Sequence, residues 1–243
     1  MLILALESSA KAASAALYEG DSLLGLSLMH CGLTHSETLL PMAEELLRRS
    51  GKSMAEVGLV AVARGPGSFT GIRIGAATAK GLCWGGEKPC CGVSTLEAMA
   101  WQGAHLEGRL LCCIMDARRG QVYNGLFRAE GGRPLRLRED RAVSLDELLP
   151  ELEEVPVLLG DGALLTAGEM DRRGMRYTLA PEPVRIQSAW GVAMAAAHAP
   201  ESAWGEPDPV YLRLSQAERE RLEKLKTERP DAGFGSAGQG GQD

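Results

Sequence analysis

A glycine-rich loop, Arg64-Gly-Pro-Gly-Ser-Phe-Thr-Gly71, carries the densest signal for chemistry in the chain. It follows an apolar run at 57–63 and precedes a helical pattern. Backbone N–H groups and the helix dipole gather at such a junction, which can therefore hold a phosphate. The alternative is a tight turn that lets the strand and the helix pack closely. On the first interpretation the loop contributes four residues to a phosphate or nucleotide site: Gly65, Gly67, Ser68 and Thr70.

Three catalytic interpretations of this loop fail on spacing or residue type. A P-loop needs Gly-Lys-Ser/Thr where the chain has Gly71-Ile-Arg73. The glycines follow the pattern G-x-G-x-x-x-G, one residue wider than a dinucleotide fingerprint. A nucleophile elbow at Ser68 would need glycines where Pro66 and Thr70 stand. A peptidase that uses Ser68 also has no identifiable base nearby in the sequence.

Several carboxylates follow strand-like runs, where an acid can face a metal–phosphate. Glu7 and Ser8 end the first run and are added to the candidate nucleotide site, while Asp116 and Asp161 end later runs. The sequence does not show whether these acids converge. No two of the four histidines have the i, i+4 spacing of a helical metal site, so we predict no metal centre.

Composition predicts a cytoplasmic chain that does not enter the membrane. No apolar run approaches the roughly 18 residues of a membrane span, and the first residues lack the basic segment of a signal peptide. Six cysteines include the neighbours Cys90-Cys91 and Cys112-Cys113 without a C-x-x-C motif. We expect reduced, mostly buried thiols.

Positive charge is concentrated in one segment of a chain whose net charge is −6. Residues 109–141 contain eight arginines and four acidic residues, a local charge of +4. Such a cluster is either a solvated strand face or an RNA contact, and it is too modest to grip nucleic acid unaided. Its members are Arg109, Arg118, Arg119, Arg128, Arg133, Arg136, Arg138 and Arg141.

The order of predicted elements indicates an α/β fold with two similar lobes. Three strands followed by alternating helices and strands occur twice along the chain. The predicted strands are 2–7, 12–18, 22–29, 57–63, 89–93, 110–115, 121–127, 135–143 and 155–159, and the predicted helices are 39–49, 71–84, 94–101, 144–149 and 188–198. We place the N-terminal lobe at 1–104 and the C-terminal lobe at 105–187, with the helical region 188–214 packing back on the first lobe and a disordered tail at 215–243.

Two helices of the first lobe are candidates for a partner-binding surface. The first, capped by Thr38, carries an apolar stripe widened by one further leucine. The second keeps glycines that each cost about 1 kcal/mol relative to alanine, which a gain in close backbone approach would offset. The approaching element is either a partner or the chain's own sheet. The residues of this predicted surface are Leu39, Leu40, Ala43, Leu46, Leu47, Gly71, Gly75 and Ala79.

Several motifs, in order and spacing over about residues 1–214, resemble the TsaB (YeaZ) family. They are Leu4-Ala-Leu-Glu-Ser-Ser9, Thr34-His-Ser-Glu-Thr-Leu-Leu-Pro41, Gly65-Pro-Gly-Ser-Phe-Thr-Gly-Ile-Arg-Ile-Gly75, Ala79-Lys-Gly-Leu82, Asp116-Ala-Arg-Arg119, Val122-Tyr123 and Tyr211-Leu-Arg213. The resemblance implies the two-lobed actin-like ATPase (ASKHA) fold, with duplicated ribonuclease-H-like domains. It also implies heterodimerisation with a TsaD-like transferase, aided by a TsaE-like ATPase, to threonylcarbamoylate the tRNA adenosine beside the anticodon.

Two departures bear on catalysis. TsaD-like sequences carry a His-x-x-x-His metal motif where this chain has Thr95 and Met99, which are poor ligands for Zn²⁺ or Fe²⁺ in a site built for imidazole. Glu7 stands where the family usually has Asp, which leaves nucleotide binding open. We expect a non-catalytic subunit without a cofactor. Within the complex, Arg118 and Arg119 of this chain are the candidate contacts to tRNA. Whether the isolated chain forms a homodimer stays open. The alternatives are an ATP-dependent kinase of this fold, with Glu7 and Asp161 flanking a magnesium–phosphate, or a metal-dependent peptidase or transferase.

Overall fold

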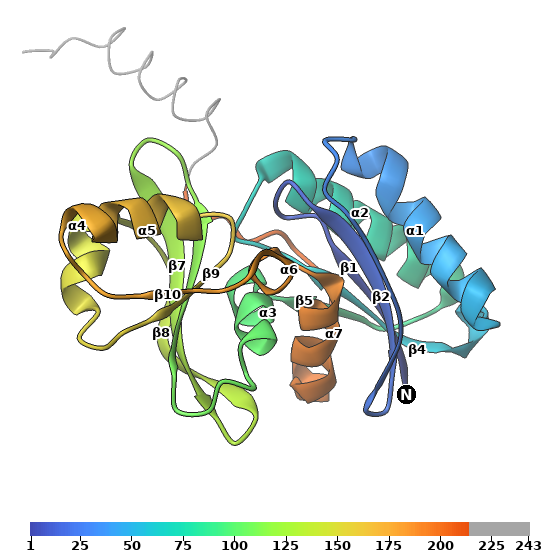
Figure 1. Cartoon of the computed structure of the whole chain (residues 1–243). Coiled ribbons are helices and arrows are strands. Elements are labelled where there is room, and N and C mark those ends of the chain that lie inside the picture. The colour runs from blue at the N-terminus through green and yellow to red at the C-terminus, as the bar shows by residue number, and fades with distance from the viewer. Residues whose placement is uncertain (214–243) are drawn as a thin grey trace, which may run out of the picture. The chain divides into compact units, whose positions relative to one another are not determined.

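Two five-stranded mixed sheets form the framework of the computed structural model, which describes residues 1–213 (Figure 1). The first has the order β3-β2-β1-β4-β5 and the second β10-β9-β6-β7-β8. The strands are β1 (Leu2–Glu7), β2 (Ala13–Glu19), β3 (Ser22–Met29), β4 (Val57–Ala63), β5 (Cys90–Val93), β6 (Leu110–Asp116), β7 (Gln121–Glu130), β8 (Arg133–Ser144), β9 (Val157–Leu159) and β10 (Thr178–Leu179). Read from β8, the second sheet repeats the order of the first, which confirms the predicted duplicated, two-lobed α/β fold of the actin-like type.

Helical layers alternate with the two sheets. They are α1 (His35–Ser50), α2 (Phe69–Gly86), α3 (Thr95–Gln102), α4 (Leu145–Leu148), α5 (Ala163–Arg172), α6 (Glu182–Arg185) and α7 (Ala189–His198), with 3-10 turns η1 (Met54–Glu56), η2 (Leu149–Glu151) and η3 (Glu201–Ala203). α1 and α2 cover one face of the first sheet and α7 covers the other, while α3 packs between α7 and the second sheet. α4 and α5 cover the far face of that second sheet. The central strands of each sheet are therefore buried on both faces, whereas the edge strands β3 and β8 are largely exposed.

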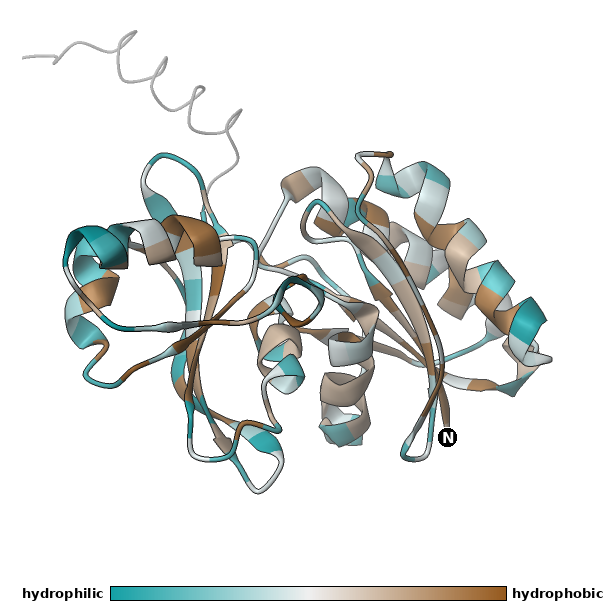
Figure 2. Ribbon diagram, in the orientation of Figure 1, coloured by the Kyte–Doolittle hydropathy of each residue, from teal (hydrophilic) through white to brown (hydrophobic). Residues whose placement is uncertain are grey.

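The central strands read as continuous apolar runs because of this double cover. All six residues of β1 are buried, and the strand pairs antiparallel with β2 and parallel with β4. α7 likewise carries apolar or small residues over most of its surface (Figure 2), as a helix between two layers requires. At its crossing with α3, a Cβ on Gly191 would collide with the carbonyl oxygen of Ala98. Glycine at position 191 thus sets the distance between the two helices.

The predicted start of the first helix is wrong by one turn. α1 begins at His35 with Thr34 as N-cap residue, so Thr38 lies inside the helix and donates its hydroxyl to the Thr34 carbonyl. The ring of His35 hydrogen-bonds the Ala10 carbonyl at 2.7 Å, which ties this extra turn to the loop after β1. Pro41 consequently lies in the helix interior and not in its first turn. A tertiary contact sets the boundary, and local capping preferences could not reveal it.

Other boundaries agree within a few residues. β1, β3 and β4 span the predicted ranges, and Ser94 caps α3 as predicted by accepting the N–H of Glu97. α5 and α6 have no counterpart in the prediction. No helix in residues 1–213 is long and apolar enough to cross a membrane. The tail predicted at 215–243 lies outside the described residues.

Candidate functional site

Glu7, at the carboxyl end of β1, is a fully buried acid. Its Oε1 accepts the backbone N–H of Ser9 at 2.6 Å, whereas Oε2 has no hydrogen-bond partner. Burial, aided by the negative charge of Asp161, outweighs the Ser9 hydrogen bonds and raises the pKa of Glu7 to about 7. The carboxyl group is therefore held on the border between its neutral and charged forms at neutral pH.

The strand-end acids of the two lobes do approach one another. Asp161 follows β9 and accepts a hydrogen bond from Gln187 Nε2 at 3.2 Å. Its pKa is raised, chiefly by burial, with a contribution from the charge of Asp116. Asp116 in turn accepts the N–H of Arg118 at 2.7 Å. The structure thus brings Glu7, Asp116 and Asp161 into one region where the lobes meet.

A metal–phosphate does not fit this arrangement through Glu7. The side chain has no solvent-accessible surface, and Ser9, whose hydroxyl lacks a partner, is equally enclosed. In the part of the chain that the structure describes, no three acidic, histidine or cysteine side chains are grouped closely enough to hold a metal ion. An ion bound by Glu7 would require this interior to open.

The glycine-rich loop packs against the chain's own backbone at the candidate phosphate site. A Cβ on Gly67 would collide with the Ser9 carbonyl, and one on Gly71 with the Ser8 carbonyl. The Ser68 N–H donates to the Ser9 carbonyl at 2.7 Å, and Ser8 Oγ donates to the Gly71 carbonyl at 2.9 Å. Of the candidate site, Glu7, Ser8 and Gly65 are buried in this close-packed junction and Gly67 is half-buried, whereas Ser68 and Thr70 are exposed at its rim. The tight-turn alternative describes it better.

The predicted partner surface is largely buried, which corrects that prediction. Leu39, Ala43 and Ala79 belong to the core between the sheet and its two helices. Gly71 and Gly75 face Ser8, whose hydroxyl would lie 2.5 Å from a Cβ on Gly75. The glycines permit close approach of α2 to its own sheet. Of the eight residues, Leu40 is exposed, and Leu46 and Leu47 are half-buried.

The solvent side of the same two helices presents a second set of residues, mostly apolar or small, of which the sequence analysis named only Leu40. We define the outer α1/α2 surface by six exposed residues: Leu40, Pro41, Glu44, Ala77, Gly81 and Trp84. Trp84 is 89% exposed, and a Cβ on Gly81 would meet no atom. The 3.6-residue period of an α-helix places these residues opposite the buried stripe, so the sequence did contain a pattern that indicates this surface. Both sides of α2 carry small residues, so periodicity alone did not separate them.

The C-terminal segment covers the first half of α2 but not this surface. The Tyr211 ring stacks on Phe69 with centroids 4.6 Å apart, and its hydroxyl accepts a hydrogen bond from Arg73 at 2.9 Å. Lys80 forms an ion pair with Glu206 at 2.7 Å. These contacts fix the segment along one edge of α2, leaving Ala77, Gly81 and Trp84 exposed.

Thr95 and Met99, where the family resemblance places the transferase metal motif, are core side chains. Thr95 is fully buried, its hydroxyl has no partner, and its N–H donates to the Gly65 carbonyl at 3.0 Å. Met99 is 1% exposed and packs in the core against the second sheet, where a Cβ on Gly160 would lie 2.9 Å from its sulfur. A hydroxyl and a thioether so enclosed do not fit a transition-metal site.

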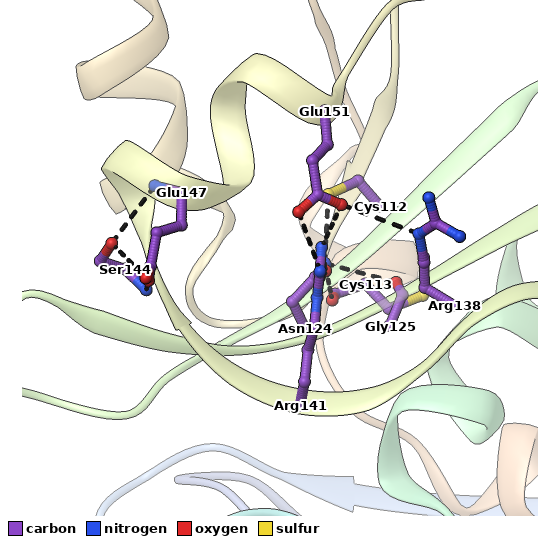
Figure 3. A network of polar contacts seen from close by, with 9 residues as sticks. All are labelled: Cys112, Cys113, Asn124, Gly125, Arg138, Arg141, Ser144, Glu147 and Glu151. Carbon is purple, nitrogen blue, oxygen red and sulfur yellow. Dashed lines mark hydrogen bonds and ion pairs between the residues drawn. The ribbon is translucent and has the colours of Figure 1, made fainter.

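Four of the eight arginines in the cluster, Arg128, Arg136, Arg138 and Arg141, form ion pairs with acidic side chains of the chain itself. Figure 3 shows Glu151 between Arg141 and Arg138 of β8, with Arg141 also reaching Asn124. Asn124 is fully buried and donates to the Cys113 carbonyl at 3.2 Å, which anchors the network in the sheet. Arg128 pairs with Glu154 and Arg136 with Glu97. These pairs favour the interpretation of a solvated strand face.

Arg118 and Arg119 lie outside the strands that carry those arginines. Both occupy the turn between β6 and β7, both are exposed, and both have left-handed backbone conformations, with φ of 62° and 54°. The Asp116 carboxylate holds the turn through the Arg118 N–H. The turn therefore places two arginines at the surface of the second lobe.

Comparison with known proteins gives consistent similarities over most of the chain. A family described as "TsaD: tRNA N6-adenosine threonylcarbamoyltransferase" matches residues 30–163. The tRNA threonylcarbamoyladenosine biosynthesis protein TsaB of Bacillus subtilis (strain 168) is 34% identical, with 93% of this chain and 100% of that protein covered. The TsaB protein of Escherichia coli (strain K12) is 39% identical, with 89% and 96% covered. The solved structure of YeaZ from Pseudomonas aeruginosa superposes with a TM-score of 0.71 at 27% identity, covering 87% of this chain and 99% of that one.

Proposed function

This chain belongs to the TsaB (YeaZ) family, and we propose that it serves tRNA threonylcarbamoyladenosine biosynthesis as the non-catalytic partner of a TsaD-like transferase. The outer α1/α2 surface carries the proposal. It combines an exposed tryptophan with small residues on which another helix can lie closely. A partner built on the same two-lobed plan would offer a matching helix pair.

The energetics of interfaces favour this surface over other parts of the lobe. Interfaces depend on a few central anchors, among which tryptophan is enriched, surrounded by contacts that exclude water. Trp84 supplies such an anchor, and Leu40 adds apolar area on the neighbouring helix. Glycine at position 81 allows a partner backbone to approach α2, at a cost in helix propensity of about 1 kcal/mol.

The absence of catalysis by this subunit is the second part of the proposal. Thr95 and Met99 are committed to the core, so transfer chemistry that requires a metal falls to the partner. The interior position of Glu7 and the internal contacts of the glycine-rich loop support a subunit that functions without a nucleotide cofactor of its own. Neither the kinase nor the metallopeptidase alternative gains support from an observed geometry.

The remaining roles follow from the same proposal. A TsaE-like ATPase would act on the heterodimer, and tRNA would be reached through the complex in the cytoplasm. Arg118 and Arg119 are the arginines that we assign to the tRNA contact, because their turn lies at the surface of the second lobe. Without its partner, the outer α1/α2 surface could pair with a second copy of the chain.

The test is complex formation between purified Gly81→Arg and a TsaD-like protein from the same organism, measured by size-exclusion chromatography and calorimetry. Arginine fits at position 81 because no atom lies near the added Cβ. We expect circular dichroism to remain unchanged and affinity to fall at least about 100-fold, as for loss of a central contact. Leu164→Arg, at a position 58% exposed on α5, is the matched control and should bind normally.

A buried site on the same helix gives a second control. Ala79→Arg places a charge in the core, so this variant should lose its fold and not merely its partner. Wild-type affinity in folded Gly81→Arg, together with weakened binding by Leu164→Arg, would move the interface to another part of the molecule.

A further inference from the structure

Cys83, near the end of α2, and Cys90, at the start of β5, face each other across a three-residue connection. Both line the same surface cavity, and each thiol changes the pKa of the other, lowering that of Cys83 and raising that of Cys90. Cys83 Sγ also reaches the Pro89 carbonyl at 3.6 Å. Neighbouring thiols of this kind form a disulfide when their Cβ atoms approach to about 4 Å.

Access to the pair is one-sided. Both cysteines line a surface cavity of about 670 Å³, together with Trp84, Lys80, Lys88 and the segment 205–207. Cys83 is half-buried at this cavity, whereas Cys90 is 7% exposed. A small reagent can therefore reach Cys83 first, and Cys90 lies behind it.

The other four cysteines do not share the surroundings of Cys83 and Cys90. Cys91 points to the opposite face of the first sheet, into the core beneath α7, and burial raises its pKa to about 11. Cys112 and Cys113 are fully buried in the second sheet. Cys31 is exposed in the loop before α1. Cys83 and Cys90 combine proximity with an open approach.

We propose that Cys83 and Cys90 form a thiol–disulfide exchange site that takes a low-molecular-weight disulfide as its oxidant and closes into an intrachain disulfide. The Cys83 thiolate attacks one sulfur of the small disulfide, forms a mixed disulfide and releases one thiolate, which takes up a proton. Cys90 then loses its proton and attacks Cys83 Sγ, displacing the second small thiolate. Two protein thiols are oxidised and one small disulfide is reduced to two thiols.

The electrostatics of the pair agree with this division of roles. The hydrogen bond from Cys90 lowers the pKa of Cys83, which favours the attacking thiolate at the cavity. The same contact, followed by burial, raises the pKa of Cys90, which stays protonated until Cys83 has reacted. The disulfide would tie the end of α2 to β5 beside the exposed ring of Trp84.

The experiment treats the full chain with oxidised glutathione and digests it with a protease that cleaves after Glu87, between the two cysteines. In the wild type we expect the two peptides to remain joined, with a combined mass about 2 Da below that of the reduced pair. In Cys90→Ala, glutathione should stay on Cys83 at a level at least about 10-fold above the wild type, because no second thiol removes it. Cys31 provides an internal control, since its glutathione adduct should form equally in both proteins.

A dithiol-binding trivalent arsenical supplies an independent readout. Phenylarsine oxide should bind the wild type and Cys91→Ser, quench Trp84 fluorescence and fail to do so in Cys83→Ser. Separate peptides after oxidation of the wild type, or a stable Cys83–glutathione adduct equal to that of Cys90→Ala, would overturn the assignment. Equal arsenical binding by Cys83→Ser would overturn it as well.

Discussion

Glu7 carries an ionisable group into the interior at the junction of β1 and the loop after it. The Ser9 N–H satisfies one carboxylate oxygen, and the other faces the interior without a partner. Because the pKa is about 7 in the folded state and about 4.5 when unfolded, the folded chain binds the proton more tightly. Stability contributed by this group is therefore present below pH 4.5 and is lost as pH rises through 7.

Glu7→Gln should remove that pH dependence. A shift of about 2.5 pKa units corresponds to about 3 kcal/mol, so the variant should gain about that much stability relative to the wild type between pH 4.5 and pH 8. Urea unfolding of both proteins across this range provides the measurement. A stability difference that stays constant with pH would show that the carboxyl group is not held neutral by burial.

At the level of elements, α2 contains glycines with opposite roles. Gly71 lies against the Ser8 carbonyl, where a methyl group would collide with backbone, whereas a methyl on Gly81 would project into open space. We expect Gly71→Ala to lower the free energy of unfolding by about 3 kcal/mol. Gly81→Ala should raise it by about 0.5–1 kcal/mol through helix propensity. Similar urea midpoints for the two variants would contradict these roles.

The same helix shows how far the sequence could predict the structure. The apolar run at 57–63 and the glycine-rich loop after it predicted where α2 begins. Similar apolar runs predicted the strands of the two sheets. The buried side of α2 did not, because Gly75 and Ala79 inside are as small as Ala77 and Gly81 outside. α5 was missed since its ten residues include Gly168 and carry only a short apolar pattern. Which small residue of α2 meets the sheet depends on contacts with Ser8, which lies 63 residues before Gly71 in the chain.

The sequence predicted only part of the candidate site, because the rest depends on contacts between distant segments. The strand-end acids Glu7, Asp116 and Asp161 were recognised from local pattern, and they do converge. Their burial could not be predicted, because it depends on how the loop after β1 packs against the glycine-rich loop. Trp84 was passed over as one aromatic residue near a helix end, and its exposure is a property of the folded lobe.

At the scale of the whole molecule, α3 and α7 form a shared layer between the two sheets. Gly191 lets the helices approach, and the Trp101 ring stacks on His198 at 4.4 Å between centroids. α1 and α2 cover the face of the first sheet opposite to α7, so the outer α1/α2 surface lies on the other side of that sheet from this layer. A partner docked on α1 and α2 and a tRNA held at Arg118 and Arg119 would thus use separate parts of the chain.

The most direct test of a non-catalytic partner is a reconstituted modification reaction. Threonylcarbamoyladenosine in tRNA would be measured with a TsaD-like transferase, its TsaE-like ATPase and an activated threonylcarbamoyl donor, with or without this chain. We predict that product forms only when the chain is present, that folded Gly81→Arg reduces it at least about 100-fold, and that Glu7→Gln leaves it within about twofold of the wild type. Modification by the chain without the transferase, or undiminished modification with Gly81→Arg, would contradict the account.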